Sequence, residues 1–320
     1  MSRLEKLKLY QICYDSTSSM NMQDGFDVLD NSSGPSEFRE IVPIFRYFKT
    51  HEPADESWFG FLSPKFTEKT GLNAADITAA LREADSRVDA HLFTSTWSQI
   101  AFYKNVWEQG EYNHPGLSAV CQQLANRAGY QFDLLDSVST LNNSVFSHFL
   151  VANGKFWKEW SRIVEIYFRM ITEDDSLFQA STEHVSESLS IHPFVVERVP
   201  SLILQMGGMR GKFCQKIFEA KPLTEANHLY NPAYSFGRDM IANMPKLLLG
   251  ADMQKARFLE TGNRIHLDEY WRFRLWAPVS SGYTNMTETA LKYINDNRLT
   301  ANLAGLVKQD PPQLDAAISG

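Results

Sequence analysis

The stretch WFGFLSPKF, residues 58–66, decides the fold class that the sequence predicts. Its first five residues are apolar apart from one glycine, and the chain then turns polar at Ser63, Pro64 and Lys65. A strand that is apolar on both faces is typical of the middle of a covered sheet, most often a parallel one. Because ligands bind such sheets beyond the carboxyl ends of their strands, the serine and the lysine are candidate ligand-binding residues.

Strands and helices alternate on either side of this strand over about the first 150 residues. Alternation of this kind favours an α/β fold with a mostly parallel central sheet and helices on both of its faces. Residues 16–37 are rich in Ser, Asn, Asp and Gly and are expected to form a long loop. The other predicted strands are 7–15, 88–96 and 145–151, and the predicted helices are 37–48 (kinked at Pro43), 73–85, 115–129, the segment after Gly154, and 192–206.

Alternation gives way to mostly helical patterns towards the C-terminus. We therefore expect a catalytic domain over residues 1–210, a mainly helical extension over 211–307 and a flexible tail over 308–320.

Composition excludes several classes of protein. The 320 residues are 43% hydrophobic and 22% charged, as in ordinary globular proteins. A formal net charge of -7 and an isoelectric point near 5.7 argue against a nucleic-acid partner. The start of the chain has no apolar signal-peptide stretch, and no window approaches the roughly 18 apolar residues of a membrane span. The expectation is a cytoplasmic protein with at most peripheral membrane contact.

The motifs of several large families are missing from the sequence. There is no Walker loop, no G-x-G-x-x-G and no G-x-S-x-G, which argues against P-loop kinases, Rossmann dehydrogenases and α/β-hydrolases. Neither paired cysteines nor histidines show zinc-ligand spacing. Cys13, Cys121 and Cys214 are far apart and are expected to be free, buried thiols.

The order of the remaining motifs resembles that of GT-A glycosyltransferases, and most of all a bacterial branch found among capsule and O-antigen biosynthesis genes. The resemblance covers about residues 5–210. It implies a Rossmann-like GT-A fold and an enzyme of cell-surface polysaccharide synthesis that moves a sugar from a UDP- or GDP-sugar to a saccharide or lipid-linked acceptor. The segments that carry it are a charged helix at 37–48, the strand and polar cluster at 58–65, a strand-turn-helix at 142–160, and Glu197–Arg198.

One departure from the family concerns metal binding. In most GT-A enzymes the matching strand ends in Asp-x-Asp, whose carboxylates hold Mg²⁺ or Mn²⁺ on the nucleotide diphosphate. Ser63, Pro64 and Lys65 stand there in this chain, so the resemblance implies no metal ligands at these positions and metal-independent transfer is expected. Lys65 would place its positive charge against the diphosphate in place of the metal. The alternative is that Lys65 only begins a solvated loop.

The resemblance also implies a catalytic base. Glu197 matches the carboxylate that removes the proton of the acceptor hydroxyl in inverting members of the family. The alternative is that Glu197 and Arg198 form a surface charge pair on an amphipathic helix.

The remaining donor-binding residues implied by the resemblance lie near the first strand and the first helix. Tyr10, Gln11 and Asp15 would contact the base or ribose, and Arg39 a phosphate. The alternatives are that Asp15 caps its own loop and that Arg39 is a solvated helix charge.

Two other functions remain open on the sequence alone: a non-catalytic carbohydrate-binding or assembly protein on the same fold, and an unrelated α/β phosphotransferase. Aromatic residues do not decide between them. Trp160 is expected in the core and Trp157 either there or against a sugar. The Arg- and aromatic-rich segment 266–278 is expected to pack as a helix and not to form an acceptor or lipid-phosphate surface.

Overall fold

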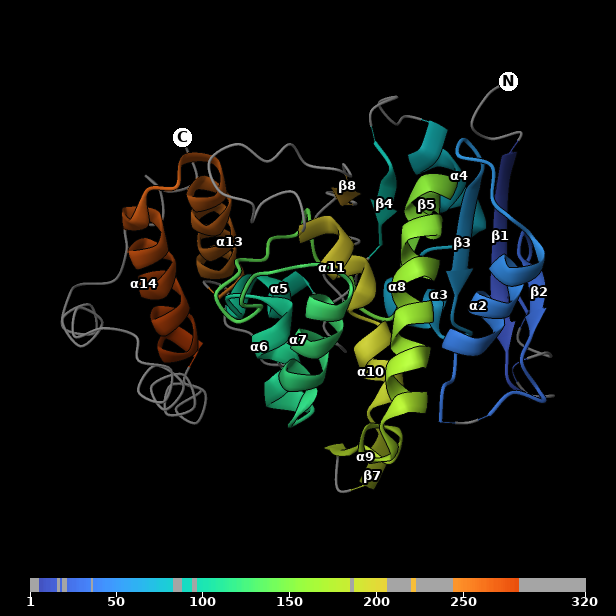
Figure 1. Ribbon diagram of the computed structural model, residues 1–320. Helices are drawn as coiled ribbons and strands as arrows, with labels where there is room; N and C mark the ends of the chain where they lie inside the picture. The colour runs from blue at the N-terminus through green and yellow to red at the C-terminus, as the bar shows by residue number, and fades with distance from the viewer. Residues whose placement is uncertain are drawn as a thin grey trace.

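The computed structural model describes residues 6–15, 18, 22–35, 37–82, 88–93, 97–184, 187–205, 220–222 and 244–281. These residues form a mixed α/β protein with one six-stranded sheet, helices on both of its faces, and a separate two-stranded ribbon (Figure 1). None of the helices in the described part of the chain combines the length and the apolar character that a membrane crossing requires.

The central sheet has the strand order β2-β1-β3-β5-β4-β8. Five of these strands run in one direction and β5 runs in the other, so the sheet is mixed and the expected mostly parallel arrangement is only partly present. The strands are β1 (Leu7–Cys13), β2 (Asp27–Asp30), β3 (Trp58–Leu62), β4 (Ala90–Leu92), β5 (Leu150–Asn153) and β8 (Ala220–Pro222).

Strand β3 lies at the centre, as its continuous apolar run predicts, and all five of its residues are buried. Phe59 and Phe61 face one side of the sheet, and Trp58 and Leu62 face the other. Gly60 lies where β3 approaches its neighbours closely: a Cβ there would be 2.8 Å from Cγ2 of Val151. A larger residue at position 60 would collide with the Val151 side chain, so a glycine allows β3 and β5 to pair here.

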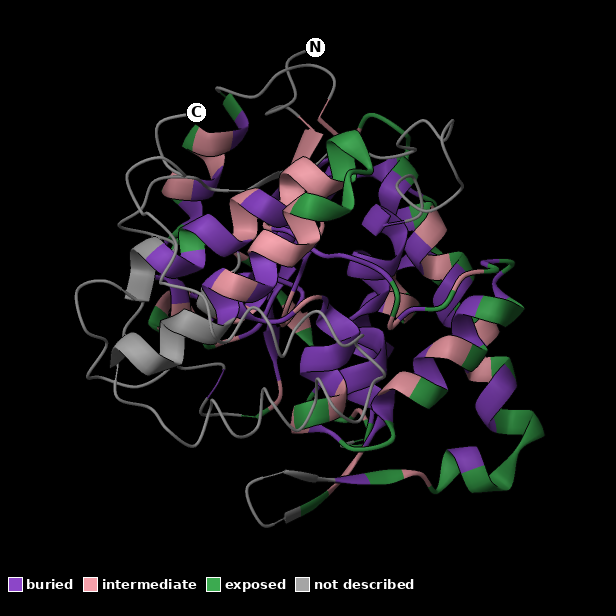
Figure 2. Cartoon of the chain, turned by 90° about the vertical axis from the view of Figure 1, so that its left-hand side faces the viewer, coloured by how far each residue is buried: buried purple, intermediate pink, exposed green. Residues whose placement is uncertain are grey.

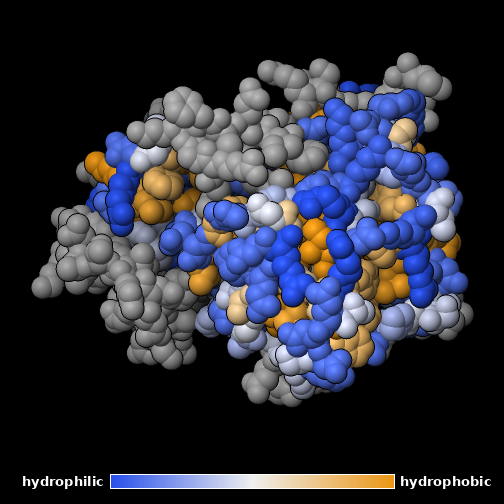
Figure 3. Space-filling view, viewed as in Figure 1, coloured by the Kyte–Doolittle hydropathy of each residue, from blue (hydrophilic) through white to orange (hydrophobic). Residues whose placement is uncertain are grey.

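Helices cover the two faces of the sheet unequally. The Phe59 and Phe61 side packs against α2 (Ile41–Thr50) and α8 (Gly154–Glu173), and also against α7 (Leu117–Arg127), α10 (His192–Val196) and α11 (Val199–Gln205). The opposite face packs against α3 (Phe66–Thr70) and α4 (Ala74–Arg82). Buried residues are concentrated in the interior elements of the protein (Figure 2), and hydrophilic side chains cover much of the described surface over α2 and α8 (Figure 3).

The long helix α8 follows the predicted apolar stripe. Trp157 and Trp160 are both fully buried, and the indole of Trp157 donates a hydrogen bond of 3.0 Å to the carbonyl of Phe59. Trp157 is therefore a core residue and not a sugar-stacking surface. The helix begins one residue earlier than expected, because the Asn153 side chain accepts from the backbone N–H of Phe156 and caps it at the predicted turn.

Three details of the predicted secondary structure were wrong. Strand β2 lies inside the expected loop 16–37, because it adds to the edge of the sheet beside β1. Pro43 does not kink a helix, since α2 begins at Ile41 and its first turn needs no N–H from that residue. The predicted helix 192–206 is two helices, α10 and α11, separated at Glu197 and Arg198.

The C-terminal described segment is helical, as predicted. Helices α13 (Met244–Thr261) and α14 (Arg264–Ser281) pack against each other, and α13 packs against α5 (Trp97–Phe102). The other parts of the predicted extension and the predicted tail at 308–320 lie outside the described residues, as does Cys214. The smaller elements are α6 (Val106–Asn113), α9 (Asp175–Phe178) and the ribbon strands β6 (Ser181–His184) and β7 (Glu187–Ser190).

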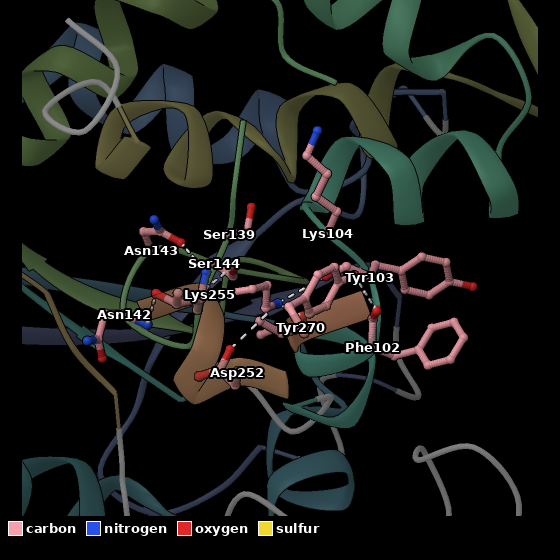
Figure 4. Close-up of polar contacts among 12 residues, drawn as sticks. Phe102, Tyr103, Lys104, Ser139, Asn142, Asn143, Ser144, Asp252, Lys255 and Tyr270 are labelled. Carbon is pink, nitrogen blue, oxygen red and sulfur yellow. Dashed lines mark hydrogen bonds and ion pairs between the residues drawn. The ribbon is translucent and has the colours of Figure 1, made fainter. Parts of the chain in front are cut away.

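Buried polar groups attach α13 and α14 to α5 and α6. The Lys255 ammonium donates to the carbonyls of Ile100 and Tyr103, and the Tyr270 hydroxyl donates to that of Phe102 at 2.8 Å (Figure 4). These carbonyls lie in the last turn of α5 and directly after it, so the two side chains help to cap the C-terminal end of the helix. Burial nevertheless lowers the pKa of Lys255 to about 8.

Candidate functional site

Polar and charged side chains gather where three parallel strands end. Tyr14 directly follows β1, Arg39 and Glu40 lie between β2 and α2, and Lys69 is in the helix that follows β3. The carboxyl ends of parallel strands share one edge of the sheet, so these residues come together there. The break between α10 and α11 brings Glu197 to the same place, where its charge interacts with those of Glu40, Lys69 and Arg39. We call these five residues the edge cluster.

The edge cluster also lies where the chain changes sides of the sheet. Strands β2 and β3 flank β1, but the helix after β2 covers one face and the helices after β3 cover the other. Open α/β sheets commonly bind ligands at such a reversal, because the two connections diverge there.

Local interactions of the chain explain why Glu197 lies in a helix break. Pro200 follows in the first turn of α11 and has no N–H for a helix continuing from α10. The backbone N–H of Glu197 still donates to the carbonyl of Pro193 at 2.9 Å, so the residue is held at the end of α10. His192, at the other end of that helix, bonds the Tyr167 hydroxyl at 2.7 Å and the Phe178 carbonyl at 3.1 Å, which fixes α10 against α8 and α9.

Arg198 has a different environment from its neighbour. It is 2% exposed, and its guanidinium donates to the Gln109 side chain at 2.7 Å and to the Phe194 carbonyl at 2.9 Å. A surface charge pair on an amphipathic helix therefore does not describe Glu197 and Arg198 in the folded chain.

The electrostatic setting of Glu197 favours proton exchange near neutral pH. Burial raises the pKa of its carboxyl to about 7, and the nearby charge of Glu40 adds to the rise, whereas Arg198, Lys69 and Arg39 oppose it. A carboxyl with a pKa near 7 has the protonation equilibrium that suits a general base at neutral pH.

Tyr14 and Glu40 form a second pair within the edge cluster. The Tyr14 hydroxyl donates a hydrogen bond to the Glu40 carboxylate. Burial and the negative charge of Glu40 raise the pKa of Tyr14 well above its ordinary value, so its hydroxyl stays protonated.

Arg39 is held by its backbone in an uncommon conformation. Its φ of 42° is in the left-handed region, which non-glycine residues adopt at a cost in free energy. The buried Asn31 supports it: its side-chain amide donates to the Arg39 carbonyl at 2.9 Å, and its backbone N–H donates to the Cys13 carbonyl at 2.8 Å. One asparagine thus ties the end of β1 to the turn that carries Arg39.

The antiparallel strand β5 adds a second unusual turn at the same edge. Because β5 runs against β3, its first residues lie beside the carboxyl end of β3, and Ser147 and His148 precede it with φ of 56° and 52°. Burial lowers the pKa of His148 to about 4, so its ring is neutral at pH 7. The Lys69 ammonium lies 5.7 Å from the ring centroid of Phe149, the next residue.

The three residues predicted to contact the base or ribose lie in different surroundings. The Gln11 side chain accepts from the backbone N–H of Gln23 at 3.1 Å, beside the edge of the sheet. Asp15 caps its own loop, because Oδ1 accepts from the backbone N–H of Ser18 at 2.7 Å. Tyr10 stacks on Phe61 with ring centroids 5.3 Å apart and packs towards α2, so it is not part of the edge cluster.

The two predicted phosphate-binding residues after β3 both precede α3 but differ in burial. Ser63 is buried, and its carbonyl accepts from the N–H of Phe66 at 3.0 Å in the turn into the helix. Lys65 is exposed directly before the helix, as the solvated-loop alternative requires. Lys69 is four residues later on the same side of the helix, and it is the lysine whose charge reaches Glu197.

Among the predicted residues, only Glu197 and Arg39 belong to the edge cluster. Tyr14, Glu40 and Lys69 were not predicted. Lys69 could have been predicted from the sequence, because it lies four residues after Lys65 and a helix places such residues on the same side. No local pattern indicates the pairing of Tyr14 with Glu40, because it depends on how α2 packs beside the end of β1.

In the described part of the chain, no three His, Cys, Asp or Glu side chains are grouped so that they would hold a metal ion. Comparison with known proteins gives no relative: no family model, no curated protein and no solved structure matches the chain.

Proposed function

We propose that this protein is a glycosyltransferase of the GT-A type, which transfers a sugar from a nucleotide-sugar donor to a hydroxyl group of a saccharide or lipid-linked acceptor. The observation that carries the proposal is the position of Glu197: a carboxyl with a pKa near 7, beside two cationic side chains, beyond the carboxyl ends of parallel strands. The mixed α/β sheet with helices on both faces is compatible with the GT-A architecture.

Glu197 acts as the general base. Attack by the acceptor oxygen on the anomeric carbon forms the new glycosidic bond while the bond to the diphosphate breaks, and the acceptor hydroxyl loses its proton to Glu197. Burial, together with the nearby charge of Glu40, gives Glu197 a basicity that an exposed carboxylate lacks. General-base catalysis of this kind contributes about 10²–10⁴-fold to the rate.

Arg39 and Lys69 neutralise the diphosphate. Both lie beside Glu197, so the leaving group is placed next to the base. Arginine binds phosphate oxygens through two parallel N–H groups, and lysine places a compact positive charge against them. Lys65, exposed one helical turn before Lys69, extends the same positive side of α3. The chain's own cations thus supply charge that a divalent metal supplies in many relatives of this architecture.

A donor screen followed by a transfer assay tests the proposal. Thermal unfolding is measured with UDP-, GDP-, dTDP- and CMP-sugars, with and without Mn²⁺, and donors that stabilise the protein are assayed for transfer to saccharide acceptors. Glu197→Gln keeps the size of the side chain and removes its basicity. We expect it to reduce turnover by about 10²–10⁴-fold and to leave donor affinity within a few-fold of wild type.

The matched control is Glu165→Gln, because Glu165 is an exposed carboxylate on α8 that pairs with Lys49. It should leave turnover unchanged. Full activity of Glu197→Gln would contradict the assignment of the base. Binding of saccharides without any nucleotide sugar would instead support a carbohydrate-binding protein, and transfer of phosphate from a nucleoside triphosphate a phosphotransferase.

A further inference from the structure

Arg198 is buried directly after the proposed base, and its hydrogen bonds go to neutral groups. Its Nε donates to the Val106 carbonyl at 3.3 Å, and its two terminal nitrogens donate to the Gln109 side chain at 2.7 Å and to the Phe194 carbonyl at 2.9 Å. No carboxylate among the described residues lies within ion-pair distance of this guanidinium. Its planar fork therefore joins the end of α10 to two residues of α6.

The surroundings of the guanidinium are closely packed. Gly110, also on α6, lies against it, and a Cβ at this position would be 2.7 Å from Nε of Arg198. The centroid of the Phe146 ring is 5.8 Å from Cζ. Burying a charge costs desolvation free energy, and apolar side chains of similar volume fill such a space at lower cost. The geometry that Arg198 fixes therefore explains this residue better than a gain in stability does.

A second pair of buried hydrogen bonds holds the other side of the helix break. The Ser201 hydroxyl, on α11, accepts from the backbone N–H of Val145 at 2.8 Å and donates to the carbonyl of the same residue at 3.2 Å. The backbone of Glu197 and Arg198 thus lies between a connection to α6 and a connection to the segment that precedes β5.

The side chain of Glu197 has no comparable support. Its backbone N–H donates to the Pro193 carbonyl, but no described residue makes a hydrogen bond to its carboxylate. The position of the carboxylate consequently depends on the position of the backbone, and Arg198 is the adjacent residue that ties this backbone to another element.

We propose that Arg198 is a positioning residue for Glu197: by tying the break between α10 and α11 to α6, it holds the general base at the carboxyl edge of the sheet. This inference rests on the proposed function and deepens it. Arg198 need not touch the substrate, since it acts through the backbone that carries the base. Its effect on the rate should therefore depend on the presence of a base at position 197.

Steady-state release of nucleotide from UDP-glucose and GDP-mannose, with methyl glycosides as acceptors, tests the inference. Arg198→Lys keeps the positive charge but not the fork that reaches three acceptors. We expect it to lower kcat by up to about a hundred-fold, the cost of moving a catalytic group by about 1 Å, and to leave KM for the donor within about twofold. In the Glu197→Gln background, where the base is already lost, it should change kcat by less than about twofold.

A milder variant and a matched control accompany this measurement. Gln109→Ala removes one of the three acceptors and leaves Arg198 in place, so it should lower kcat in the same way but by less. If Arg198→Lys does not fold, Gln109→Ala decides by the same comparison in the two backgrounds. The control is Arg274→Lys, because Arg274 is an equally buried arginine that joins α14 to α6. It should lower the melting temperature and leave kcat of the folded protein unchanged.

The outcomes separate this inference from the proposed function. A loss of kcat that disappears in Glu197→Gln supports the positioning role. Equal losses in the wild type and in Glu197→Gln would mean that Arg198 only stabilises the fold, which overturns the inference and leaves Glu197 as the base. Wild-type kcat in both Arg198→Lys and Gln109→Ala overturns it as well. If the wild type releases no nucleotide from either sugar, the proposed function is contradicted for these donors and the inference falls with it.

Discussion

Glu197 carries a cost to stability that its position explains. A carboxylate that is desolvated and placed beside a second carboxylate is less stable in the folded chain than in the unfolded chain. Its cationic neighbours reduce this cost without removing it, since the pKa remains raised to about 7. Groups with such shifts are concentrated at functional sites, because the same environment that costs stability sets the basicity.

Replacing this residue should therefore stabilise the protein in one pH range. The pKa of Glu197 in the folded chain lies above its ordinary value of 4.5, so between about pH 4.5 and about pH 7 the folded state holds a proton that the unfolded state has released. Its contribution to stability falls as the pH rises through this window. We expect Glu197→Gln to raise the free energy of unfolding by up to about 3 kcal/mol at about pH 8 and by little at about pH 4.5.

Urea titrations of the variant and of the wild type at both pH values measure this difference, with Glu165→Gln as the control. A gain of equal size at the two pH values would mean that packing, and not the charge of Glu197, causes the change.

The two lysines of the α3 region should differ in their effect on donor binding. Lys69 is partly buried beside Glu197, whereas Lys65 is exposed before the helix. We expect Lys69→Gln to weaken binding of UDP-glucose or GDP-mannose by about ten- to a hundred-fold, the value of a charged hydrogen bond to phosphate. Lys65→Gln should weaken it less, because solvent screens an exposed charge.

Calorimetry in the presence and in the absence of EDTA measures both effects, with Lys49→Gln as the control. If Lys65→Gln has the larger effect, the side chain predicted from the sequence is the principal phosphate ligand. A strong requirement for Mn²⁺ in binding would contradict the assignment of the neutralising charge to these side chains.

At the scale of elements, the junction between β5 and α8 organises the centre of the sheet. Asn153 is the last residue of the strand and the cap of the helix. Its side-chain oxygen accepts from the N–H of Phe156 at 3.1 Å, and its amide donates to the Asp89 carboxylate at 2.6 Å. One side chain thus connects the start of α8, the end of β5 and Asp89, the residue directly before β4.

Loss of this side chain should destabilise all three elements together. Asn153→Ala removes a helix cap and leaves polar groups in a mostly buried site without partners, so we expect a loss of about 1–3 kcal/mol in the free energy of unfolding. Asn153→Asp keeps the capping oxygen but places a second negative charge against Asp89, and it should also be destabilising.

Denaturant unfolding followed by far-ultraviolet circular dichroism measures the loss. The exposed Asn142 provides the control, since Asn142→Ala should change stability by less than about 0.5 kcal/mol. Equal effects of the two alanine substitutions would show that Asn153 has no special role.

At the scale of the whole molecule, α13 and α14 are joined to the body by a buried ion pair. Arg274 and Glu108 are 2% and 1% exposed at their side chains, and the guanidinium nitrogen is 2.6 Å from the carboxylate oxygen. Arg274 also lies over the rings of Phe102 and Trp271, each at 4.7 Å from the centroid. The pair joins α6 to α14, and the contacts of Arg274 with these rings help to offset the desolvation cost of its charge.

Breaking the pair should be far more damaging than replacing it. Arg274→Met leaves the Glu108 carboxylate buried without its guanidinium, and we expect a loss of about 3–5 kcal/mol. Combining it with Glu108→Gln removes the uncompensated charge and should recover part of that loss. Urea titration of the single and double variants tests this, with Arg257→Met as the control. A double variant that is less stable than Arg274→Met would contradict the explanation.

The sequence by itself determined the class of the fold and the main elements of its centre. The strand at 58–62 and the buried stripe of α8 were predicted correctly. A strand buried on both faces shows a continuous apolar run, and a helix buried on one side shows apolar residues at helical spacing, so both can be recognised from nearby residues alone. Glu197 and Arg39 were also predicted as site residues, and the structure brings them together. Their roles remain proposals.

Tertiary structure alone decided the direction of β5, the existence of β2 and the membership of the edge cluster. Strand direction depends on how the chain returns to the sheet, and β2 is a short edge strand whose exposed side chains give no apolar pattern. Tyr14, Glu40, Lys69 and Glu197 are distant in sequence, and these polar and charged groups interact only because three strand ends and a helix break meet at one edge. Electrostatic coupling depends on separation and burial, which local sequence patterns do not encode.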